Sequence, residues 1–393
     1  MKKVFVFLAG LLSIATFLTG CDAERVNQPI HPITSTKMNT TKKQGVSNIN
    51  FSQVKLFNQH CGWAFTQKGD ILRLERNTST WFDVTPKELD PYEKQFSSVF
   101  FLNRSDAWIA VHENSISGLP LILYYTTDGG KRWTAQPFTQ LLKYPSGNVY
   151  LKFLNSKIGY LININPGMGT FKAALYKTEN GGVVWRFINQ TNTTTLSKGI
   201  QPLPHVTESL PFGANPLFTT SNIGWLFGKA RADYLLPNQT WLYLTNNGGQ
   251  TWTHINLLPK PVSSHVAVEI NWAESIDQSV LFIQTLRHIP TLDLISNTLY
   301  EKKNQGQTWH SLLLPSDSIL YASFVSPTKG WILLNNGVLD QITAQQIITR
   351  THIPHVQDVL GMHFLTSKTG YLVYAQIIKW TNTGGTTWTQ LST

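Results

Sequence analysis

The chain has 393 residues, of which 14% are charged, and its 32 Lys and Arg against 22 Asp and Glu give a formal net charge of +10. This charge is dilute and forms no long run of Lys or Arg, which argues against nucleic-acid binding. The 13 Trp, 13 Tyr and 20 Phe, with 27 Gly, 19 Pro and no long helical period after residue 20, favour an all-β fold of short strands.

The first twenty residues have the layout of an export signal. A basic MKK start is followed by the apolar run VFVFLAGLLSIATFL, and LTGC at 18–21 matches the bacterial lipobox, whose cysteine is lipidated and becomes the first mature residue. A transmembrane helix is the alternative, but the apolar run is short and ends in small residues before a polar segment. We therefore expect a lipoprotein signal peptide at 1–20 and a lipid on Cys21. The lipid would hold the protein on the cell membrane, facing outside the cytoplasm.

The next segment has the composition of a tether. Residues 22–50 are rich in Thr, Asn, Lys and Gln with almost no apolar clustering, so 21–50 is predicted to be the lipidated cysteine and a flexible linker. With Cys21 lipidated, Cys61 is alone and cannot form an intramolecular disulfide. Its place beside Gly62 at a strand opening predicts a small core residue.

From residue 51 onward, a turn that ends in Gly-Trp or Gly-Tyr repeatedly opens an apolar strand. The openings are GWAF at 62, GYLI at 159, GWLF at 224, GWIL at 330 and GYLV at 370, and the variants DAWIAV at 106 and QSVLFI at 278 fill two gaps. Seven openings predict seven repeats of short antiparallel strands. Their limits are 51–85, 96–139, 148–188, 216–258, 265–314, 319–351 and 357–392.

A second motif recurs in five of these repeats, as TTDGGKRW at 126–133, TENGGVVW at 178–185, TNNGGQTW at 245–252, KKNQGQTW at 302–309 and TNTGGTTW at 381–388. Its third position always offers a side-chain oxygen to the turn backbone, from Asp128, Asn180, Asn247, Asn304 or Thr383. A catalytic acid or a metal ligand would need the carboxylate, which the copies do not keep. We therefore expect a structural role for these residues and for the tryptophans that end the motif, Trp133, Trp185, Trp252, Trp309 and Trp388.

This pattern resembles the Asp-box, or bacterial neuraminidase repeat, of sialidases, sortilin-type receptors and photosystem II assembly factor-like propellers. The resemblance implies that each motif lies on the hairpin between the third and fourth strands of a propeller blade. It covers 51–393 at the level of the repeat pattern and is closest to the single seven-bladed propellers of the assembly factor-like and sortilin-like group. The expected fold is all-β, a seven-bladed β-propeller of four-stranded antiparallel blades.

The longer connections gather at one end of the predicted blades. In a propeller, second-to-third strand hairpins and blade-to-blade connections share one face, and the long examples are 112–120, 165–171, 229–238, 286–297 and 191–215. Long connections gathered on one face are typical of a binding surface. Insertion at tolerant loop tips without any function explains them equally well. The candidate partner-binding residues are His112, Glu113, Arg231, Asp233, Tyr234, Arg287, His288 and Asp293.

An enzyme is the alternative function. Sialidases bind a substrate carboxylate with three arginines and carry an Arg-Ile-Pro motif before the first Asp-box. In this chain the most similar segment is RHIP at 287–290, late in the sequence and with an extra histidine. We therefore expect no catalytic residue, no cofactor and no metal. The predicted function is that of a non-enzymatic, lipid-anchored binding or scaffolding propeller, a monomer that docks an envelope protein or a glycan. Glycoside hydrolysis of sialidase-like or endoglucanase-like type is the alternative.

Overall fold

The computed structural model describes residues 36–39, 45–75, 80–89, 94–113, 121–138, 147–165, 172–190, 206–207, 215–227, 242–257, 265–276, 279–288, 291–303, 308–344 and 346–391. The chain divides into two units, Met1–Thr34 and Ser35–Thr393, and every described residue belongs to the second. The described residues form seven antiparallel sheets and one short 3-10 helix, η3 (Val356–Asp358). Within these residues no helix is long and apolar enough to cross a membrane. The predicted signal peptide and Cys21 lie outside them.

Each sheet contains four strands that follow one another in sequence, and we number the sheets as blades one to seven and these strands A to D in chain order. Blade one holds β3 (Phe51–Asn58), β4 (Cys61–Thr66), β5 (Ile71–Leu74) and β6 (Trp81–Asp83), and blade two holds β7 (Lys94–Phe101), β8 (Ala107–Glu113), β9 (Leu121–Thr126) and β10 (Arg132–Pro137). Blade three holds β11 (Asn148–Phe153), β12 (Gly159–Asn165), β13 (Lys172–Thr178) and β14 (Trp185–Gln190), and blade four holds β16 (Asn215–Phe218), β17 (Gly224–Phe227), β18 (Leu242–Thr245) and β19 (Trp252–His254). Blade five holds β20 (Val266–Ile276), β21 (Ser279–His288), β22 (Leu294–Lys303) and β23 (His310–Leu314), and blade six holds β24 (Ile319–Ser326), β25 (Lys329–Leu334), β26 (Val338–Thr343) and β27 (Ile347–His352). Blade seven holds β28 (Val359–Phe364), β29 (Gly370–Tyr374), β30 (Ile378–Thr381) and β31 (Thr389–Leu391).

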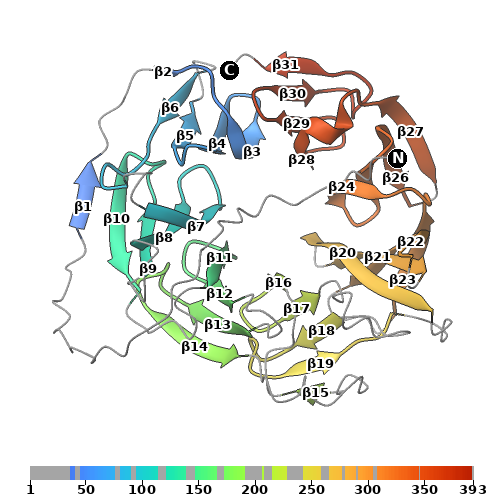
Figure 1. Ribbon diagram of the computed structural model, residues 1–393, viewed down its shortest axis with the longest axis horizontal. Helices are drawn as coiled ribbons and strands as arrows, with labels where there is room; N and C mark the ends of the chain where they lie inside the picture. The colour runs from blue at the N-terminus through green and yellow to red at the C-terminus, as the bar shows by residue number, and fades with distance from the viewer. Residues whose placement is uncertain are drawn as a thin grey trace, which may run out of the picture. The chain divides into compact units, whose positions relative to one another are not determined.

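The blades form a ring with the A strands innermost and the D strands toward the outside (Figure 1). The fold is an all-β seven-bladed propeller of four-stranded antiparallel blades, so the predicted fold class is confirmed. The seven predicted repeats correspond one to one with these sheets, although blades two and four begin at Lys94 and Asn215 and blades three and six end at Gln190 and His352, one or two residues outside the predicted limits. The Gly-aromatic openings at Gly159, Gly224 and Gly370 are the first residues of B strands.

Three further strands add to the outer edges of blades. β1 (Thr36–Asn39) pairs with β10, β2 (Gly45–Val46) pairs with β6, and β15 (Val206–Thr207) pairs with β19, all antiparallel. The first two lie within 21–50, so the prediction of a flexible linker is wrong at these residues. Composition misses them because a strand on an exposed sheet edge is held by backbone hydrogen bonds and needs no apolar side chains.

The hydrophobic cores lie between neighbouring blades and are built around a repeated aromatic stack. The aromatic residue of a B-strand opening stacks on a Phe at the end of the next blade's A strand. The stacked pairs are Trp63–Phe101, Trp108–Phe153, Tyr160–Phe218 and Trp331–Phe364, with ring centroids 5.4, 3.8, 3.5 and 3.7 Å apart. The residues that open each B strand therefore also join that blade to the next one.

The glycine of these openings is required by close packing inside the blade. A Cβ on Gly159 would lie 2.5 Å from the ring of Phe153, and one on Gly330 would lie 2.3 Å from the ring of Phe324. In both blades the Phe of the A strand therefore lies directly over the glycine of the B strand. Phe153 thus packs on its own blade with one edge and on Trp108 of the preceding blade with its face.

Blade seven closes on blade one without sharing a strand, because each of these blades takes all its described strands from one end of the chain. The N–H of Phe51 donates to the carbonyl of Ala375 over 2.6 Å, and the N–H of Leu56 donates to the hydroxyl of Tyr371 over 3.1 Å. A common buried core that includes Trp81 also joins the two blades. We call this junction the seam, and it is held by packing and hydrogen bonds.

Candidate functional site

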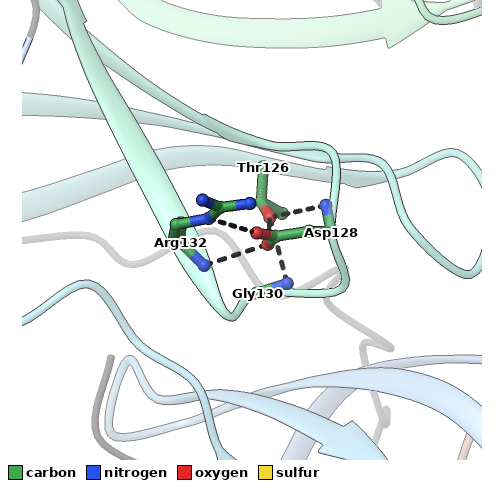
Figure 2. Close-up of polar contacts among 4 residues, drawn as sticks. All are labelled: Thr126, Asp128, Gly130 and Arg132. Atoms are coloured by element: carbon green, nitrogen blue, oxygen red, sulfur yellow. Dashed lines mark hydrogen bonds and ion pairs between the residues drawn. The ribbon is translucent and has the colours of Figure 1, made fainter. Parts of the chain in front are cut away.

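The TTDGGKRW segment forms the C–D turn of blade two, between β9 and β10 (Figure 2). The N–H of Gly130 donates to Thr126 Oγ1 over 3.0 Å, and the N–H of Arg132 donates to Asp128 Oδ1 over 2.9 Å. The Nε of Arg132 also donates to Asp128 Oδ2 over 2.9 Å. Partial burial alone would raise the pKa of Asp128, but the hydrogen bonds from Arg132 and Thr126 outweigh it and lower that pKa.

The sibling turns repeat the main contact with a neutral side chain. Asn180 Oδ1 accepts the N–H of Val184 over 2.8 Å, and Asn247 Oδ1 accepts the N–H of Thr251 over 2.9 Å. In blade seven a threonine hydroxyl, Thr383 Oγ1, accepts the N–H of Thr387 over 2.9 Å. The turn thus requires an oxygen that accepts the N–H four residues ahead, and a charge is dispensable for this contact. Asn304 lies outside the described residues.

The tryptophans that follow these turns anchor them in the cores. Trp185, Trp252 and Trp388 each donate Nε1–H to a glycine carbonyl of their own turn over 3.0 Å. Trp133 differs, since it donates to the carbonyl of Val84 in blade one over 2.6 Å. Trp309 is half-buried, and its ring lies 5.9 Å from that of Trp225 in blade four.

The candidate binding residues of blades two and four are only partly described. Arg231, Asp233 and Tyr234 lie outside the described residues, and of Glu113 only the backbone is described, paired with Lys94. His112 lies at the end of β8. Burial lowers the pKa of its ring, while a hydrogen bond with the backbone of Gly147 in blade three opposes this.

The blade-five candidates share one hairpin. Arg287 Nε lies 3.4 Å from Glu269 Oε2, and its Nη1 donates to the carbonyl of Leu292 over 3.2 Å. The N–H of His288 donates to the carbonyl of Asp293 over 2.9 Å, and Leu292 has a φ of 61° in the turn. Arg287, His288 and Asp293 therefore lie together, and no contact among the described residues joins them to His112.

Sequence reasoning missed a group of interacting titratable residues on the innermost strands. Lys55 lies in β3, Lys152 in β11, Glu274 in β20 and His363 in β28, and we call these four residues the axial cluster. Burial raises the pKa of Glu274 to about 7, against the hydrogen bond from the N–H of Phe324 and the charges of the two lysines. The group is electrostatically coupled although its members come from blades one, three, five and seven.

The other members of the axial cluster have shifted pKa values for the same reason. Burial lowers the pKa of Lys152 to about 8, with Glu274 opposing the shift and Lys55 adding to it. Burial also lowers the pKa of Lys55, and the negative charge of Glu274 partly opposes this by raising that pKa. The pKa of His363 falls to about 4 through burial and the charge of Lys55, so its ring is neutral at pH 7.

One signal in the sequence could have found three of these residues. Lys55, Lys152 and His363 each stand seven positions before the glycine of a B-strand opening, at Gly62, Gly159 and Gly370. The corresponding residues of blades two, four and six are Phe100, Leu217 and Ser323. Ionisable residues at one repeat position inside apolar strands would have marked the axis of the ring. Glu274 does not stand seven positions before the start of its B strand, because the strands of blade five are longer and β21 begins at Ser279.

Four of the six described arginines are engaged by acceptors of the protein itself. The contacts join Arg73 to the carbonyls of Gly62 and Arg104, Arg132 to Asp128, Arg287 to Glu269, and Arg350 to the side chain of Gln341. A sialidase-like site would instead need guanidinium groups that converge on a substrate carboxylate. In the part of the chain that the structure describes, no group of three or more His, Cys, Asp or Glu is arranged to hold a metal ion.

No family model matches the chain. A stretch of 142 residues, 35% of the chain, is 26% identical to the photosystem II stability/assembly factor HCF136 of rice, Oryza sativa subsp. japonica, and covers 30% of that protein. The same factor from Arabidopsis thaliana is also 26% identical over 142 residues, covering 35% of this chain and 31% of the factor, so the match spans less than a third of each relative. A solved structure of YCF48 bound to D1 peptide has a TM-score of 0.54 and 16% identity, covering 87% of this chain and 96% of that one. This structural likeness is one of fold.

Proposed function

We propose that this protein is a non-enzymatic binding or scaffolding propeller, lipid-anchored outside the cytoplasm, that docks a protein partner. The observation that carries the proposal is the combination of a seven-bladed ring with a local sequence match to an assembly factor. A solved propeller of the same fold is described as bound to a peptide, which supports a protein rather than a glycan as the partner. The proposal concerns binding and does not extend to a photosystem.

The proposed docking surface is the face of the ring that bears the B–C loops of blades two to five. In an antiparallel meander, B–C hairpins lie at the opposite end of the strands from the A–B and C–D turns. On the proposed face, blade five presents exposed His288 and Asp293 beside the half-buried Arg287. The C–D turns on the other face carry internal hydrogen bonds that support an Asp-box assignment and a structural role.

The proposal can be tested by capture on the intact, membrane-bound protein with an affinity tag at its C-terminus. Arg231→Ala, Tyr234→Ala and Arg287→Ala combined should weaken recovery of a co-purifying envelope protein, with nearly unchanged melting temperature. The matched control, Lys131→Ala with Gln250→Ala on the C–D turns, should leave recovery intact. Equal loss in both variants would overturn the assignment of the face.

Enzymatic activity is the competing proposal, and a separate assay tests it. The purified protein and its Asp233→Asn and Glu113→Gln variants would be assayed against sialoside and β-glucan reporters. Turnover that depends on either carboxyl would overturn the non-enzymatic proposal, because general acid–base catalysis of glycoside hydrolysis needs an ionisable carboxyl group.

A further inference from the structure

The axial cluster lies where A strands from four blades approach the centre of the ring (Figure 1). Leu56, Phe153 and Phe364, the next residues along three of these strands, are buried in cores between blades. Side chains alternate along a strand, so Lys55, Lys152 and His363 point away from those cores. Protein atoms surround the ring of His363 closely enough to lower its pKa, yet the residue keeps a large solvent-accessible surface, and the other three members are half-buried. Solutes can therefore reach the group.

Several contacts fix the cluster in place. The ring of His363 lies 5.2 Å from that of Tyr371, whose hydroxyl accepts the N–H of Leu56 beside Lys55. The ammonium group of Lys55 lies 6.0 Å from the ring centre of Phe57 and 5.9 Å from that of Phe100 in blade two. Such cation–π contacts hold the ammonium group and leave its hydrogen-bonding capacity unused.

The charges in the cluster do not balance. Two ammonium groups interact with a single carboxylate, Glu274, which also accepts the N–H of Phe324. Among the described residues, the ion pairs within 4.0 Å are formed by other groups, so neither Lys55 nor Lys152 is in direct contact with a carboxylate. Partly buried cations without a contacting anion attract one from solution.

We propose that the axial cluster binds a small oxyanion, a carboxylate or a tetrahedral sulfate or phosphate group, through the ammonium groups of Lys55 and Lys152. Phe57 and Phe100 exclude water from one side of Lys55, which strengthens its attraction to an anion. Glu274 competes with the bound anion for both lysines. This site is separate from the B–C loop face and does not depend on partner docking there.

The test measures sulfate binding to the full-length protein by isothermal titration calorimetry at constant ionic strength, with chloride as the competing salt. Sulfate is the probe because its charge is constant across the pH range of interest. Lys55→Met and Lys152→Met should each weaken sulfate binding about tenfold or more, since each removes one of two partly desolvated cations. Lys68→Met in blade one and Lys157→Met in blade three, both on exposed turns, are the matched controls and should leave binding unchanged.

Glu274→Gln provides the test that best distinguishes anion binding by the axial cluster from a structural role of Glu274. Removing the competing carboxylate should tighten sulfate binding, whereas a merely structural role for Glu274 predicts no gain. In the wild-type protein, affinity should fall as the pH rises from about 6 to about 9, because Glu274 becomes ionised and Lys152 loses its proton. This pH profile keeps the proposal testable if the Gln variant does not fold.

A parallel titration with acetate distinguishes the two classes of ligand. Stronger binding of acetate assigns the site to planar carboxylates, and stronger binding of sulfate assigns it to tetrahedral anions. Absence of binding beyond that of chloride would overturn the proposal. Equal weakening in the Lys68→Met and Lys157→Met controls would overturn it as well.

Discussion

Asp128 offers a direct test of whether a residue in a C–D turn does more than hold the turn. We predict that Asp128→Asn leaves the fold intact, because Asn180 and Asn247 already make the same backbone contact in sibling turns. The lost ion pair with Arg132 should cost at most about 1 kcal/mol, since the Arg132 side chain is 64% exposed. Thermal unfolding of the two proteins would measure the difference.

The control for this change is Asp128→Ala, which removes the acceptor and leaves the N–H of Arg132 without its partner. It should be less stable than Asp128→Asn. Loss of partner capture in Asp128→Asn at unchanged melting temperature would contradict the structural role and assign the carboxylate a function.

Trp133 should be far more sensitive than Asp128, although the two residues belong to one motif. Its side chain is fully buried, packs against Trp63 of blade one at 6.5 Å between ring centroids, and donates to the carbonyl of Val84. Trp133→Ala should therefore lower the free energy of unfolding by about 3 to 5 kcal/mol. Urea denaturation followed by fluorescence would test this, and a loss below about 1 kcal/mol would contradict the packing role.

At the scale of strands, the outer-edge pairing of β1 with β10 can be tested through its backbone hydrogen bonds. A double change of Lys37→Pro and Met38→Pro removes two N–H groups opposite Thr134 and Trp133, so it should release the added strand. Hydrogen exchange followed by mass spectrometry should then show faster exchange at 132–135. Exchange in the inner strands β7 and β8 should be unchanged, and an unaltered rate at 132–135 would argue against β1.

The limits of sequence reasoning are clearest at this scale. The B strands were predictable because Gly159, Gly330 and Gly370 mark sites where a Phe of the same blade leaves no room for a Cβ. The strands β1 and β2 were not, because edge pairing uses backbone groups that every residue has. The axial cluster brings Lys152 and Glu274 together across blades. Only the closed ring reveals that proximity, since it joins residues far apart in the chain.

For the whole molecule, the axial cluster predicts a characteristic dependence of stability on pH. The pKa of Glu274 is raised from 4.5 to about 7, so ionisation is costlier in the folded state and stability falls as the pH rises through this window. The pKa of Lys152 is lowered from 10.5 to about 8, so stability is regained as the pH rises above 8. The contribution of the cluster is therefore smallest between pH 7 and 8.

Glu274→Gln isolates the first of these effects. Urea midpoints measured at pH 5 and pH 7.5 should differ less in the variant than in the wild-type protein, because the amide does not titrate. An equal pH dependence in the two proteins would contradict the raised pKa of Glu274.

The proposed lipid anchor also concerns the whole molecule, and Cys21→Ser tests it. If a lipid is attached to the Cys21 thiol, its removal should move the protein from the detergent phase to the aqueous phase on temperature-induced phase separation. Cys61→Ser is the matched control and should stay with the detergent, because Cys61 is buried in blade one. A Cys21→Ser protein that remains in membranes with its first residues uncleaved would favour a spanning helix.

The seam has a consequence for how the chain acquires its fold. Because every blade takes its four main strands from one continuous stretch, each sheet can form from local pairings as that stretch leaves the ribosome, which keeps contact order low until the last step. Only the junction of blade seven with blade one must wait for the full chain. A circular permutant opened between two other blades would move this late step elsewhere and leave every four-stranded sheet uncut.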